Sequence, residues 1–105
     1  MRIAIASNGK DENAKVSKVS GRAPYYLIFE DGKLTKAIKN PFRIGGGAGF
    51  GVAEMLSDEK VEIVVSGKFG TNMTNALKSK GIRHKELSGM TVREALKEVK
   101  NVSSG

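Results

Sequence analysis

Most apolar residues lie in short runs that have the length of β-strands. Ile3–Ala6 is continuously apolar, and Val61–Val65 contains a single acidic residue, as in strands that are buried on both faces. Tyr25–Glu30 is rich in β-forming residues, and the Asp31-Gly32 pair after it predicts a two-residue hairpin turn. The predicted strands are 3–6, 25–30, 34–39, 61–65 and an edge strand at 82–87.

Three other segments repeat apolar residues at helical spacing. The first contains Val52, Met55 and Leu56, and the second contains Met73, Ala76 and Leu77. Thr71 or Asn72 is expected to cap the second helix, and Gly81 to close it. Thr91-Val92-Arg93-Glu94 has the pattern of a capping box, which predicts that the third helix begins there.

The resulting order, β-β-β-α-β-α-β-α, indicates an α/β fold with a five-stranded mixed sheet. Strand 2 is expected to be antiparallel and helices to cover both faces. Strands 1, 3, 4 and 5 would then end at one edge of the sheet. The loops at 9–21, 40–51, 66–72 and 88–90 gather at that edge, where open α/β sheets bind ligands.

Length and composition restrict the class of protein further. A chain of 105 residues is long enough for one core, so we expect one domain over residues 1–105. It contains no apolar run of membrane-spanning length, and its first residues alternate like a strand rather than a signal peptide, which predicts a cytoplasmic protein. The absence of cysteine excludes disulfides and cysteine-ligated zinc or iron–sulfur sites.

The net charge of +7 favours anionic partners in general. The lysines are spread along the chain without a polybasic block, so a solvated lysine-rich surface is an equally good interpretation. The aromatic residues lack the spacing of ribonucleoprotein motifs, which leaves nucleic-acid binding as a weak alternative.

Three loops are marked by glycine, and all three belong to the expected ligand edge. They are Ser20–Tyr25, Gly45–Gly51 and Ser66–Asn72. Glycine permits tight strand-to-helix turns, which would be a purely structural role, or close approach of the backbone to a ligand. Because two helices are expected to begin in these loops, their free N–H groups would favour an anion, with Arg22 and Lys68 adding charge.

The familiar enzymatic motifs are absent. The glycine run at 45–51 matches neither the dinucleotide-binding nor the nucleotide-triphosphate phosphate loop. The serines at the edge lack a base, because the only histidine, His84, lies in the predicted edge strand. We therefore expect no catalytic residues, no metal-ligating set and no enzymatic activity.

Several segments, in their order and spacing, resemble the dinitrogenase iron–molybdenum cofactor biosynthesis family. The most specific is Gly21-Arg22-Ala23-Pro24-Tyr25-Tyr26, and the others are Ile3–Ser7, Asn40-Pro41, Gly47–Gly49, Gly67–Gly70 and Gly81-Ile82. The family includes nitrogenase accessory proteins that carry the iron–molybdenum cofactor or its precursor. The resemblance implies a ribonuclease H-like three-layer fold.

The sequence departs from the family at two positions. Members commonly have His-Phe before Gly-Arg-Ala-Pro, where this chain has Val19 and Ser20, and the Asp often found after the first strand is Asn8 here. Without an edge histidine or any cysteine, an iron–molybdenum cofactor or iron–sulfur precursor would be weakly held. Its anionic cluster and carboxylate-rich organic acid would be bound by Arg22, Lys68 and backbone N–H groups.

The resemblance thus implies a non-enzymatic carrier of an anionic small ligand or metallocluster, with a cofactor-assembly or acceptor protein as its partner. The alternative is a protein-interaction or regulatory module without a cofactor. The candidate cofactor-binding residues are Asn8, Gly21, Arg22, Gly47, Gly49, Gly67, Lys68, Gly70 and Asn72.

Overall fold

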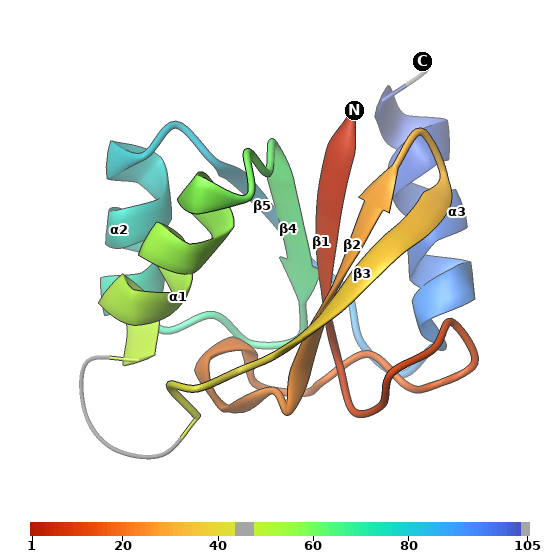
Figure 1. Cartoon of the computed structure of the whole chain (residues 1–105), viewed down its shortest axis with the longest axis horizontal. Coiled ribbons are helices and arrows are strands. Elements are labelled where there is room, and N and C mark those ends of the chain that lie inside the picture. Colours follow the sequence, from red (N-terminus) through yellow and green to blue (C-terminus); the bar gives the residue numbers. More distant parts are fainter. Residues whose placement is uncertain (44–47, 104–105) are drawn as a thin grey trace.

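The computed structural model describes residues 1–43 and 48–103 and contains a five-stranded mixed sheet between two helical layers (Figure 1). The sheet order is β3-β2-β1-β4-β5, with β2 antiparallel to both neighbours and the other strands parallel to one another. The elements are β1 (Arg2–Ser7), the 3-10 helix η1 (Ser20–Arg22), β2 (Tyr25–Glu30), β3 (Lys33–Lys39), α1 (Ala48–Asp58), β4 (Ile63–Ser66), α2 (Thr71–Ser79), β5 (Arg83–Glu86) and α3 (Val92–Ser103). The predicted order and fold class are confirmed.

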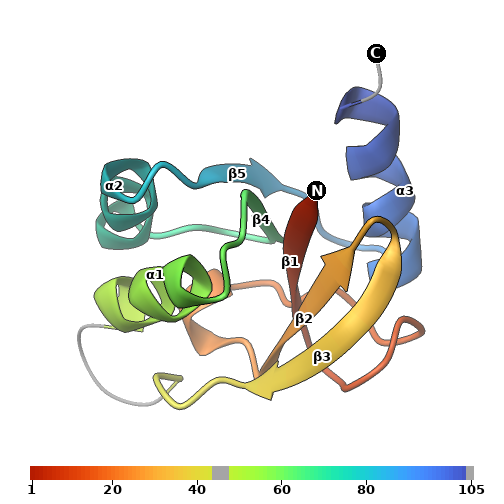
Figure 2. The ribbon, with the colours of Figure 1, turned by 45° about the horizontal axis from the view of Figure 1, so that its top comes forward.

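Alternation along the strands sends side chains to two separate cores. On one face Ala4, Tyr26 and Val64 pack beneath α1 and α2. On the other face Ile5 and Leu27 pack against α3. Figure 2 shows α1 and α2 on one side of the sheet and α3 on the other.

The strand predicted at 61–65 begins two residues later than expected. Lys60 adopts a positive φ of 60° and closes α1, so that the Val61 N–H donates to the Leu56 carbonyl instead of joining the sheet. Val61 is nevertheless buried in the core. Val61 therefore belongs to the segment that ends α1, and β4 starts at Ile63.

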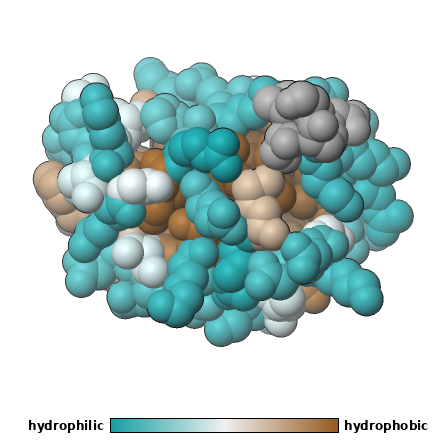
Figure 3. Space-filling model, turned by 90° about the horizontal axis from the view of Figure 1, so that it is seen from above, coloured by the Kyte–Doolittle hydropathy of each residue, from teal (hydrophilic) through white to brown (hydrophobic). Residues whose placement is uncertain are grey.

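The hairpin turn forms where it was expected. Asp31 and Gly32 have φ values of 50° and 83°, the positive values that a tight two-residue turn between twisted strands requires. This turn belongs to the edge of the sheet opposite the long loops. Seen from that side, hydrophilic residues surround a central hydrophobic area (Figure 3).

The described parts of the long loops, residues 9–21, 40–43, 66–72 and 88–90, lie together at the other edge, at the bottom of Figure 1. The loop before η1 is paired with the loop after β4, since the Gly67 N–H donates to Ser17 and the Ser20 N–H donates to Lys68. It also reaches the start of α3, where the Val16 N–H donates to Met90. The described parts of the predicted loops therefore converge as expected, while residues 44–47 of the loop at 40–51 lie outside the described residues.

The described helices include none that is both long enough and apolar enough to cross a membrane. The longest, α3, has twelve residues, fewer than the roughly 20 that span a bilayer.

The capping box at the start of α3 gives a pH-dependent prediction. The Thr91 N–H donates to Glu94 Oε1 at 2.9 Å, and the Glu94 N–H donates to Thr91 Oγ1 at 3.2 Å. The first of these bonds lowers the pKa of Glu94 below its usual 4.5. Glu94→Gln should therefore be less stable than wild type near neutral pH. The difference should shrink as pH falls below 4.5 through the folded-state pKa, because the carboxylate that the fold favours is then protonated.

Urea denaturation of both proteins between pH 7 and pH 3 measures this difference. A gap between the two midpoints that stays constant over the range would contradict the assigned role of Glu94.

Candidate functional site

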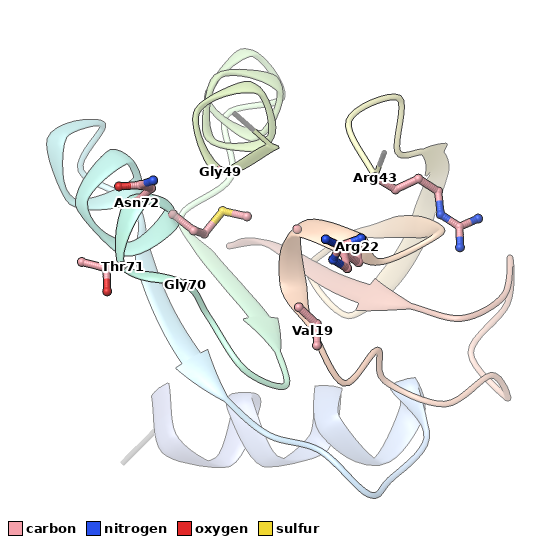
Figure 4. Close-up of a pocket in the computed structure, with 9 residues that line it drawn as sticks. Val19, Arg22, Arg43, Gly49, Gly70, Thr71 and Asn72 are labelled. Atoms are coloured by element: carbon pink, nitrogen blue, oxygen red, sulfur yellow. The ribbon is translucent and has the colours of Figure 1, made fainter. Parts of the chain in front are cut away.

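A cavity of about 300 Å³ opens at the loop edge, between η1 and the first turn of α2. Its volume is at the lower end of the range for small-ligand pockets. Figure 4 shows Arg22 on one side, between Val19 and Arg43, and Thr71 and Asn72 across the cavity. The lining residues are Val19, Gly21, Arg22, Arg43, Gly49, Gly70, Thr71, Asn72 and Met73.

Arg22 is presented by a short turn whose backbone is anchored in the core. Ser20, at the start of this turn, is fully buried, and its carbonyl accepts a hydrogen bond from the Tyr26 hydroxyl at 2.5 Å. Ser20 Oγ and the same hydroxyl are 2.9 Å apart. The turn is thus fixed, while the Arg22 side chain itself is exposed and free to meet a ligand.

Burial raises the pKa of Tyr26 above its usual 10. The fold favours the neutral phenol. The stability that this preference contributes is therefore fully present below pH 10 and is lost as the pH rises beyond 10. Tyr26→Phe should lose about 1–2 kcal/mol at pH 7, because the Ser20 carbonyl loses a buried donor. The variant should also lose less stability than wild type when the pH is raised above 10, because it has no phenol at this position to ionise. Urea denaturation of both proteins at pH 7 and at pH 11 tests both effects. If the variant loses as much unfolding free energy as wild type between these two pH values, the second effect is contradicted.

The first turn of α2 faces the cavity with its N–H groups unclaimed by a cap. The N-cap residue is Gly70, with φ −76° and ψ 159°, and it makes no side-chain capping hydrogen bond to the helix. The prediction that Thr71 or Asn72 caps the helix is therefore wrong, because both residues already belong to its first turn. A first turn without a side-chain cap offers its N–H groups and its positive dipole end to an anion.

The two helices that frame the cavity approach closely at this end. A Cβ on Gly49, near the start of α1, would lie 2.8 Å from the backbone nitrogen of Met73 on α2. Gly49 thereby allows the two helices to touch beside the cavity. Met73 itself is buried in the core as well as lining the cavity.

The predicted site residues divide into three groups. Those that line the cavity are Gly21, Arg22, Gly49, Gly70 and Asn72. Those placed elsewhere at the loop edge are Asn8, Gly67 and Lys68, and Gly47 lies outside the described residues. Gly67 contacts the backbone of Lys18, and the Lys68 N–H donates to the Lys18 carbonyl at 2.6 Å, so both residues join two loops.

Sequence reasoning missed four of the lining residues, which are Val19, Arg43, Thr71 and Met73. Arg43 follows Asn40-Pro41 in a loop that was expected at this edge, and its charge is the signal that could have identified it. Val19 is 41% exposed although it is apolar, because it forms part of the cavity wall.

The cavity is cationic and offers few ligands for a metal. Two arginines and no acidic residue are among its described lining. Within residues 1–43 and 48–103, no group of three His, Asp or Glu side chains could hold a metal ion. His84 is on β5, where its ring packs against Phe69 with centroids 4.9 Å apart.

Comparison with known proteins identifies the fold and the family. The apo form of the orange protein from Desulfovibrio gigas matches with a TM-score of 0.89 and 25% identity, over 96% of this chain and 88% of that one. A putative NifB protein from Thermotoga matches with a TM-score of 0.80 and 31% identity, over 99% and 88% of the two chains. No curated protein matches the sequence significantly.

The sequence model of the dinitrogenase iron-molybdenum cofactor family matches residues 1–102. Together with the two similar structures, this match supports an accessory role in cofactor biosynthesis or binding. The chain belongs to the dinitrogenase iron-molybdenum cofactor family.

Proposed function

We propose that this protein is a non-enzymatic carrier of an anionic metallocluster, either the iron–molybdenum cofactor or an iron–sulfur precursor of it. The observation that carries the proposal is the charge of the cavity: Arg22 and Arg43 line it, and no described lining residue is acidic. The uncapped start of α2 adds backbone N–H groups on the opposite wall.

The lining determines how such a cargo would be held. The chain has no cysteine, and its single histidine is on β5, outside the cavity. Among the described lining residues, a metal would find only the Met73 thioether, the Thr71 hydroxyl and the Asn72 amide as side-chain ligands. The arginines would bind the anionic surface or the organic-acid carboxylates of the cluster by charge-assisted hydrogen bonds instead.

Binding of this kind suits a carrier, because the cluster would be released without breaking strong metal–thiolate bonds. The same logic implies a second protein that delivers or accepts the cluster. We infer that this partner is a cofactor-assembly or acceptor protein, as the family membership suggests.

The test is anaerobic incubation of the purified protein with isolated iron–molybdenum cofactor, followed by size-exclusion chromatography. Molybdenum and iron should co-elute with the protein, and the visible spectrum of the cluster should change on binding. Raising the ionic strength should release the cluster, since the interaction is electrostatic and its site is open to solvent. Separate elution of cluster and protein at low salt would refute the proposal.

A further inference from the structure

Asn40 is a buried polar residue that joins the two turns carrying the arginines of the cavity. It follows β3 and is 2% exposed. Its side-chain amide donates to the carbonyl of Gly21 at 3.2 Å and to that of Ala23 at 2.9 Å, the residues on either side of Arg22. Its Oδ1 accepts the N–H of Phe42, the residue before Arg43, at 2.9 Å.

We propose that Asn40 is a positioning residue: it fixes the backbone of Arg22 relative to that of Arg43, so that both guanidinium groups act on one anionic ligand. The inference rests on the proposed function, since it names the group that organises the same cavity. Arg22 and Arg43 are on different turns, and a ligand that contacts both would otherwise bear the cost of ordering the two turns.

The turn that carries Arg43 is fixed from a second direction. A Cβ on Gly51 of α1 would lie 2.5 Å from the ring of Phe42, so the absence of a side chain there lets this ring lie against the helix. The Asn40 side chain holds the same turn from the side of η1. Together, the Phe42 ring and the Asn40 amide place the backbone before Arg43 between α1 and η1.

The chemistry at position 40 requires a side chain that both donates and accepts. Asn40 uses both amide hydrogens and its oxygen. Asn40→Asp keeps the shape and the acceptor for the Phe42 N–H, but an ionised carboxylate would face the carbonyls of Gly21 and Ala23 without a hydrogen to donate. Protonation of the introduced carboxyl at low pH would restore one donor.

The experiment measures binding of sulfate, an anion that keeps its charge between pH 4 and 8, by NMR of the arginine Nε–Hε groups. In wild type, sulfate should shift the signals of both Arg22 and Arg43. At pH 7, Asn40→Asp should bind sulfate and isolated iron–molybdenum cofactor about tenfold more weakly. The sulfate affinity should recover as pH falls.

The matched control is Val65→Ala, which removes buried apolar atoms on the α3 face of the sheet, away from the cavity. It should lower stability without changing sulfate affinity. If Asn40→Asp binds both probes as tightly as Val65→Ala does, or loses affinity equally at every pH, the positioning role of Asn40 is refuted. Failure of wild type to bind the cofactor refutes the proposed function itself.

A measurement on wild type keeps the inference testable if Asn40→Asp does not fold. The two side-chain amide hydrogens of Asn40 should exchange slowly with solvent and show scalar coupling across the hydrogen bonds to Gly21 and Ala23. Both signals should shift when sulfate binds at the arginines. Rapid exchange, or signals indifferent to sulfate, would overturn the inference.

Discussion

Gly67→Ala should destabilise the protein by about 3 kcal/mol, the upper end of the cost of forcing atoms into a packed site. The added Cβ would contact the carbonyl oxygen of Lys18 and lie 2.6 Å from its carbonyl carbon. These atoms belong to the backbone, which is held at this point by hydrogen bonds from Gly67 to Ser17 and from Lys68 to Lys18. The backbone can therefore move away only by breaking the pairing of the two loops.

Gly70→Ala provides the matched control three residues later in the same loop. A Cβ there would have no atom within 4 Å, and φ at Gly70 is −76°, which alanine adopts without strain. Urea denaturation should show a loss of at most about 1 kcal/mol for Gly70→Ala, because alanine is a poorer N-cap than glycine, and a much larger loss for Gly67→Ala. Equal stability of the two variants would contradict the close approach of the loops.

The different surroundings of these glycines illustrate which features could be predicted from the sequence and which could not. The presence of a glycine in the sequence does not distinguish whether its backbone contacts a ligand, a helix or another loop. Gly67 was grouped with the ligand-binding glycines, yet its neighbour is the Lys18 backbone, a contact across 49 residues that no local pattern encodes. The hairpin at Asp31-Gly32 was predictable because the signal and the structure involve the same few residues.

The order of strands and helices was also predictable, and with it the edge where the loops converge. The turn chemistry and the alternation of strands and helices determine which strand ends face the same way. The cavity and its lining were less predictable from the sequence. Arg43 reaches the cavity on a turn held by the buried Asn40, and α2 starts at Gly70 without the side-chain cap that Thr71 or Asn72 suggested. Both features depend on tertiary packing.

Arg22→Gln/Arg43→Gln should weaken the binding of isolated iron–molybdenum cofactor by at least about a hundredfold and leave the stability of the protein close to that of wild type. A hydrogen bond to a charged group is worth about 1.5–3 kcal/mol, so the lower value for each arginine gives about 3 kcal/mol in total, and every 1.4 kcal/mol corresponds to about tenfold in affinity. Stability should hold because both side chains are exposed and the turns are fixed by Ser20, Tyr26 and Asn40 instead.

Lys33→Gln/Lys78→Gln is the control that removes the same charge elsewhere. Both lysines are exposed and neither lines the cavity, yet this pair and the arginine pair each lower the net charge of +7 by two. Titration of each protein with the cofactor at low and moderate salt, read from its visible spectrum, separates the two effects. If affinity depends only on net charge, both double variants will lose it equally. If the cavity holds the cluster, only the arginine double variant will lose affinity. The salt dependence of its residual binding will then be weaker than that of wild type.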